Sequence, residues 1–129
     1  MAYLNDRVLD EGLNILDDEV NRLDICTQEP ATYAEATSTY TCGSASGDAL
    51  PTVSASGAGS PNGRQVTVGA VDHASALVTS TTTATHVAVS DTVGNRLLAA
   101  QALATSESVT TDNPFTLTSW TIRIPEAAS

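Results

Sequence analysis

Residues 85–103, THVAVSDTVGNRLLAAQAL, have the pattern of two strands joined by a tight turn. Val87 and Val89 alternate with smaller or polar neighbours, which is the period of a strand with one buried face. The DTVGN segment that follows is typical of a connecting turn, in which Gly94 and Asn95 would supply the left-handed backbone positions. The second half, RLLAAQAL, alternates as well, although it contains enough alanine to be helical in another context. The stretch therefore predicts a β-hairpin.

The same stretch carries His86, Asp91 and Arg96, which are side chains of the kind that active sites use. On a strand, His86 points away from the face of the two valines, towards solvent or an interface. Asp91 falls where aspartate favours a local backbone hydrogen bond in a turn. Arg96 begins the next strand, within reach of Asp91 or His86 across the hairpin. A hairpin explains all three positions, so we assign no catalytic residue here.

Further strand-like segments follow the same logic. Residues 64–71 alternate valines on one face, and residues 76–91 contain an edge and then a strand. Within residues 114–124 the apolar phase changes near Thr118, which indicates a β-bulge. Strands of this kind, separated by turns at short intervals, predict a mainly β fold, a small antiparallel β-sandwich or barrel.

Residues 4–25 show helical periodicity and are predicted to form one N-terminal amphipathic helix before the β domain. Five apolar residues in this segment repeat at spacings of three and four, which is a heptad-like seam. The seam, predicted to be a partner or oligomer interface, consists of Leu9, Leu13, Leu16, Val20 and Leu23. A helix of this length is marginally stable alone. We therefore expect it to dock on a partner or on another copy of the chain.

Composition divides the chain into two parts. Residues 1–29 are predicted to form an acidic helix or arm for docking or oligomerisation, and residues 30–129 a β domain. Pro30 ends the helical pattern, and the Thr-rich segment after it is strand-like. Residues 43–63 are crowded with glycine, serine, alanine and proline, which predicts a long surface loop within the β domain.

The charge balance of the 129-residue chain is strongly acidic. Fifteen acidic residues oppose five basic ones, all of them arginine, for a formal net charge of −10. A field of this sign repels nucleic-acid phosphates and anionic membrane surfaces, so we predict neither as a partner. It favours a basic partner instead. Aromatic residues are 4% of the chain, and because large side chains contribute most burial energy, we expect the protein to gain stability by assembly.

The start of the chain lacks the basic and apolar segments of a secretory signal. In addition, no apolar run reaches the roughly 20 residues that a membrane-spanning helix needs. We therefore expect the protein to be made in a cytoplasm and to stay soluble there.

Cys26 and Cys42 are the only two cysteines. A disulfide between them is possible, but two buried free thiols are the simpler interpretation. A metal site made of Asp72, His73 and His86 can be imagined, yet no ligand spacing typical of a metal motif supports it. The sequence predicts no catalytic, cofactor-binding or metal-binding residue.

Three segments together resemble a group of small virion proteins of tailed bacteriophages and related prophages. They are AYLNDRVLDEGLNIL, then TQEPATYAEATSTYTCG, and a closing block of ATHVAVSDTVGNRLLAAQAL with VTTDNPFTLTSWTIRIP. The resemblance covers nearly the whole chain except residues 43–63. It implies a small β domain with a capsid-associated role, namely a decoration (cement) protein on the head shell. It further implies the major capsid protein as partner, a homotrimer as the favoured oligomer, and the virion as location.

Two other functions stay open on the sequence alone. The same β block could stand on a head fibre, a spike or the tail as a binding module, with the Ser/Gly-rich loop meeting a glycan of the host surface. A cell-wall hydrolase would need two carboxylates in one cleft. The scattered candidates for such a pair are Asp48, Asp72, Asp91, Glu107 and Asp112. The prediction is a non-enzymatic virion structural protein, with capsid decoration as its first role.

Overall fold

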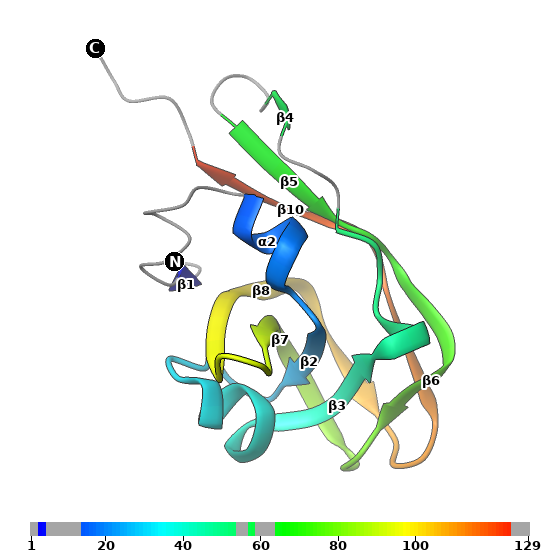
Figure 1. Ribbon diagram of the computed structural model, residues 1–129. Helices are drawn as coiled ribbons and strands as arrows, with labels where there is room; N and C mark the ends of the chain where they lie inside the picture. The colour runs from blue at the N-terminus through cyan, green and yellow to red at the C-terminus, as the bar shows by residue number, and fades with distance from the viewer. Residues whose placement is uncertain (1–2, 5–13, 54–56, 59–63, 125–129) are drawn as a thin grey trace.

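The computed structural model describes residues 3–4, 14–53, 57–58 and 64–124, and most of them lie in strands (Figure 1). The predicted mainly β, antiparallel fold is thus confirmed. No helix among the described residues is long and apolar enough to cross a membrane. In chain order the elements are β1 Tyr3–Leu4, α2 Asn14–Glu19, β2 Arg22–Cys26, η1 Glu35–Thr39, β3 Thr41–Ser46, η2 Gly47–Ala49, β4 Gly57–Ala58, β5 Arg64–Val68, β6 Val71–Val78, β7 Thr82–Asp91, β8 Arg96–Val109, β9 Pro114–Leu117 and β10 Trp120–Ile124.

Seven strands form one antiparallel sheet in the order β1-β8-β7-β2-β3-β6-β9. The predicted hairpin lies within it, because β7 pairs with β8 from Thr82 opposite Val109 to Asp91 opposite Arg96. The sheet curls, as Figure 1 shows, and one of its faces carries the main hydrophobic core together with α2. Because the strand order is open at both ends, the described strands form a curled sheet rather than a closed barrel.

The second sheet, β10-β5-β4, continues a ribbon that begins in the first. Val71 in β6 lies opposite Leu117 in β9, and Val68 in β5 lies opposite Trp120 in β10, so the pairing register crosses the interruption unchanged. Val68 and Val71 are both buried although they are three residues apart. The face directed towards the core therefore changes between them. The phase change near Thr118, predicted to be a β-bulge, is instead a corner at which both strands pass from one sheet to the other.

The helix predicted over residues 4–25 is wrong at both ends that the structure describes, because Leu4 lies in β1 and residues 22–25 lie in β2. Among the described residues, α2 ends at Glu19, and Leu23 lies in β2, a strand in the middle of the sheet. Asn21, between α2 and β2, is hydrogen-bonded to the end of β7 and the turn after it. Its N–H donates to Ser90 O at 3.1 Å, and its Oδ1 accepts from Thr92 N–H at 2.9 Å. The leucine spacing suits a helix, but pairing with strands on both sides overrides that preference.

The predicted interface seam is a core feature wherever the structure describes it. Leu16 and Leu23 are 0% exposed, and the half-buried Val20 packs against the same core. Leu9 and Leu13 lie outside the described residues. Side chains that are fully buried inside their own chain have no surface to offer a partner, so Leu16 and Leu23 do not form a docking face.

The segment predicted to be a long surface loop begins with a strand. Residues 43–46 belong to β3, in which Gly43 pairs with Ile25 on one side and Val78 on the other. A Cβ atom on Gly43 would lie 3.0 Å from Ile25 Cγ1 and 3.1 Å from the carbonyl oxygen of Leu77. The glycine therefore allows close packing within the sheet. Positions 54–56 and 59–63 of the predicted loop lie outside the described residues.

A second, smaller core covers the opposite face of the sheet beneath η1. Residues 35–39, predicted to be strand-like, instead form this short π-helical turn. His86 is half-buried on the same face of β7, and its Nδ1 lies 2.8 Å from Thr85 Oγ1. The buried members of the second core are Cys26, Ala36, Ala88, Leu97 and Ala100.

Both cysteines are free and buried, which confirms the simpler interpretation. Cys26 belongs to the second core and donates to Ala36 O, whereas Cys42 belongs to the main core and donates to Ile25 O. The two thiols lie on opposite faces of the sheet, so a disulfide would require backbone movement. Burial raises the pKa of Cys26 to about 12 and also raises the pKa of Cys42. Both thiols therefore stay protonated and unreactive near neutral pH.

The β7–β8 turn gives a direct stability prediction. Asn95 has a φ of 54°, whereas Gly94 is not in the left-handed region, so only half of the predicted turn geometry is found. Asn95→Ala is expected to lower the free energy of unfolding by about 1 kcal/mol, because a Cβ without a local hydrogen-bonding group is disfavoured there. Asn95→Gly should stay within about 0.5 kcal/mol of the parent. Urea denaturation measures both, and equal losses would contradict the explanation.

Candidate functional site

The polar residues of the hairpin do not converge into a catalytic group. His86 is separated from Asp91 by five positions of β7, a distance of about 16 Å along a strand. Asp91 Oδ1 accepts a hydrogen bond from Val93 N–H at 2.9 Å, which confirms the predicted local bond. Arg96 Nη1 lies 3.9 Å from Asp91 Oδ2 and 3.8 Å from Glu19 Oε1. These contacts hold the turn against α2.

The imagined metal site is not assembled either. His73 lies on β6 and His86 on β7, and β3 and β2 separate these strands in the sheet, a distance of about 14 Å. His73 is exposed, and its Nδ1 accepts a hydrogen bond from Ser75 N–H at 3.1 Å. In the described part of the chain no cluster of three or more His, Cys, Asp or Glu side chains could hold a metal ion.

A different feature is the gap between β8 and β9, two consecutive strands that leave edges unpaired. β8 pairs with β7 on one side, and on its other side β1 reaches only Ala99 and Ala100. β9 pairs with β6 alone. Among the strands that the structure describes, none pairs with the outer side of β8 after Ala100 or with the outer side of β9. Within the described part of the chain the sheet therefore has two open edges, joined by residues 110–113.

The second half of β8 also departs from regular pairing with β7. Glu107 lies opposite Ala84 and Ala102 lies opposite His86, so residues 103–106 stand opposite a single residue, Thr85. An insertion of this kind is a large β-bulge, which takes backbone groups out of the ladder and bends the strand. The bulge lies where β8 borders the gap.

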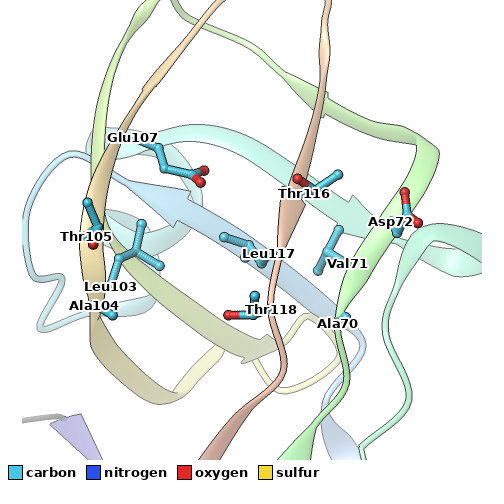
Figure 2. A pocket seen from close by; sticks show the side chains of 10 residues that line it. All are labelled: Ala70, Val71, Asp72, Leu103, Ala104, Thr105, Glu107, Thr116, Leu117 and Thr118. Atoms are coloured by element: carbon cyan, nitrogen blue, oxygen red, sulfur yellow. The ribbon is translucent and has the colours of Figure 1, made fainter.

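Three adjoining cavities fill the gap between the two strands, and we call them together the strand groove. The largest has a volume of about 570 Å³ and is lined by residues of β6, β8 and β9 (Figure 2). Cavities of about 350 and 300 Å³ extend it, one towards residues 110–113 and the other towards Trp120. Neighbouring cavities share Glu107 and Thr116 at one junction and Leu103 and Leu117 at the other. The groove thus follows much of the length of β8.

The strand groove combines apolar and acidic side chains. Figure 2 shows Leu103 and Leu117 approaching from opposite walls, and both are half-buried. Glu107 directs its carboxylate into the space from β8, and Asp72 stands on β6, beyond β9 in the same view. Both acids are exposed. No arginine is among the described residues that line the three cavities, so an occupant meets apolar contacts and uncompensated negative charge.

Trp120 adds a polar group without a partner at one end of the groove. Its ring is half-buried and lines the third cavity, and its Nε1 atom is buried without a hydrogen-bond partner. A buried indole N–H usually finds an acceptor, because leaving it unpaired costs free energy. Because this nitrogen is inaccessible to solvent, an occupant of the groove contacts the ring of Trp120 rather than its N–H group.

The residues of the strand groove were not predicted as a site. Asp72 and Glu107 are far apart in sequence, and only the strand order brings them to one gap. The sequence does contain one signal, since the apolar first half of β8 is followed by ATSES at residues 104–108. A strand that turns polar on both faces loses the covering expected of a sheet interior.

No protein-family model matches the chain, and neither a curated protein nor a solved structure matches it. The features of the chain that bear on its function are therefore the strand groove and the acidic net charge.

Proposed function

We propose that this protein is a non-enzymatic structural component of a tailed-phage virion, a decoration protein that binds the head shell and stabilises it. The strand groove is the observation that carries the proposal. It is a strand-length surface on a small β body, with backbone edges, apolar side chains and charge available to another protein. The resemblance to small virion proteins supplies the particle, and the major capsid protein is the proposed partner of a homotrimer.

The exposed chemistry of the groove supports binding over catalysis. Glycoside hydrolysis uses a pair of carboxyl groups with distinct roles, and the general acid is normally desolvated so that it stays protonated. Asp72 and Glu107 are both exposed, and in Figure 2 only Glu107 directs its carboxylate into the groove. Exposed acids on an acidic body are suited instead to a basic protein surface.

The copy number in purified particles tests this function. We expect this protein to be present in numbers comparable to the major capsid protein. Particles assembled without it should lose their contents at a lower temperature, because a ligand of the assembled shell stabilises that state by mass action. A handful of copies per particle would favour a head fibre, spike or tail component that contacts the host. Absence from the particle would overturn the virion proposal.

A further inference from the structure

We propose that the strand groove binds an extended segment of the coat subunit, which carries a basic residue and lies as an added strand between β8 and β9. The inference rests on the proposed function, because it takes the partner from the head shell. It goes further by specifying the form and the chemistry of the segment that is bound.

The backbone of the groove favours an extended occupant. An open strand edge offers a row of N–H and C=O groups that another strand can pair with, and edge addition of this kind is a recurrent mode of peptide recognition. Here two edges border one elongated space. β8 and β9 run in opposite directions through the sheet, so an added strand is antiparallel to one of them. We place it antiparallel to β8, whose uncovered edge is the longer of the two.

The side chains of the groove favour a segment with apolar residues at alternate positions. One face of an extended peptide would meet Leu103, Leu117 and the buried Val71, which calls for small apolar residues at every second position. One end of the same segment would reach the cavity that the Trp120 ring lines. An added strand would thus pair with backbone edges and cover apolar surface together.

The charge of the groove decides which class of segment fits. Glu107 directs its carboxylate into the groove, and the whole chain has a formal net charge of −10. A segment with arginine or lysine beside Glu107 gains attraction. A second copy of this chain would bring further negative charge to an acidic groove, and like charges brought together are unfavourable. We therefore assign the groove to a basic segment of the shell rather than to self-association.

Overlapping peptides of about ten residues, a length that matches a strand, would be prepared to cover the sequence of the proposed coat subunit. Trp120, the single tryptophan of the protein, reports occupancy through its fluorescence. We expect binding only by peptides that have apolar residues at alternate positions and at least one arginine or lysine. Bound peptide should also slow amide hydrogen exchange in β8 and β9. Glu107→Lys should weaken binding by about tenfold or more, whereas Glu29→Lys, the same charge change at an exposed position outside the groove, should leave it unchanged.

Intact particles that lack this protein provide the second arm, and circular dichroism checks that both variants fold. If the protein binds particles but no peptide alters the fluorescence of Trp120, the added-strand inference is wrong and the proposed function stands. If a basic peptide binds with dependence on Glu107 but particles are not bound, the groove chemistry stands and the decoration role fails. Self-association that Glu107→Lys abolishes would assign the groove to a second copy and overturn the inference.

Discussion

Replacing Arg22 with methionine is expected to lower the free energy of unfolding by about 3–5 kcal/mol, the typical cost of leaving a buried charge without its partner. Arg22 Nε and Nη2 donate to the two carboxylate oxygens of Asp24 at 2.8 and 2.9 Å. Nη2 also donates to Thr37 O in η1 at 3.2 Å, and Thr41 Oγ1 donates to Asp24 at 2.7 Å. The Asp24 side chain is 0% exposed. The network therefore joins η1 to the middle of the sheet.

The loss should depend on pH in a direction set by Asp24. Burial raises the pKa of Asp24, and the hydrogen bonds from Arg22 and Thr41 oppose that rise. In Arg22→Met the hydrogen bond from Arg22 to Asp24 is lost. The folded pKa of Asp24 therefore moves further above the unfolded value of about 3.9. The folded variant then binds a proton more tightly than the unfolded chain does. Its stability is highest below the unfolded pKa and falls as the pH rises through the folded pKa. The difference from the parent should therefore widen as the pH rises from the folded pKa of Asp24 in the parent to the higher folded pKa in the variant, and stay constant above it.

Arg96→Met is the matched control for this experiment. Its guanidinium is 43% exposed and stands 3.8 and 3.9 Å from its two acidic neighbours, so its loss should cost less than about 1 kcal/mol. Urea denaturation at several pH values compares the two variants with the parent. Equal and pH-independent losses would show that the Arg22–Asp24 pair has no special role in stability.

The strands with a clear period of two were predictable from the sequence, because each has one apolar and one polar face. The hairpin of β7 and β8 is the best example, since valine alternation and turn residues agree there. The corner between β9 and β10 was visible as a change of phase. The cause of the phase change could not be predicted, because a bulge and a change of sheet alter the phase of one strand in the same way. Only the strand that pairs with it distinguishes a bulge from a change of sheet.

The strand β2 was mispredicted because it is buried on both faces. Its sequence, RLDIC, places Asp24 between Leu23 and Ile25, which looks like the polar side of a helix when it follows LNILDDEVN. The carboxylate is tolerated in the interior only because Arg22 and Thr41 satisfy it. Thr41 comes from another strand, so the compensation is invisible in the local pattern. Tertiary pairing determined this element against its local preference.

The strand groove could not be predicted from the sequence, for a related reason. A groove between strand edges is defined by which edges are not covered, and that depends on the complete strand order. The acidic composition did indicate a basic partner, and we propose a position for it beside Glu107 in the strand groove. The described part of the leucine seam, to which the sequence assigned docking, contributes to the core instead, namely Leu16, Val20 and Leu23.

Replacing Leu16 with alanine is accordingly expected to destabilise the isolated chain by about 2–5 kcal/mol, the range for emptying a buried leucine site. Leu16 is 0% exposed in α2, a short helix that packs against β5 and closes one side of the main core. Removing its side chain leaves a cavity between helix and sheet that a six-residue helix has little means to fill. Urea denaturation of the purified protein, without any particle present, measures this loss.

Leu77→Ala provides the comparison for Leu16, because it makes the same truncation at a leucine that is 40% exposed. Its cost should be less than half of that at Leu16, since much of the side chain stays in contact with water in the folded state. Truncation of a core residue lowers the stability of the isolated chain, whereas truncation of a docking residue lowers binding to particles. The opposite outcome would be a Leu16→Ala variant whose isolated chain keeps its stability but no longer binds particles. In that case the leucine seam would be a docking surface, and the strand groove would not be the principal contact. Loss of stability with retained binding to particles at a temperature where the variant is folded would place Leu16 in the core and leave the contact to the edges of β8 and β9.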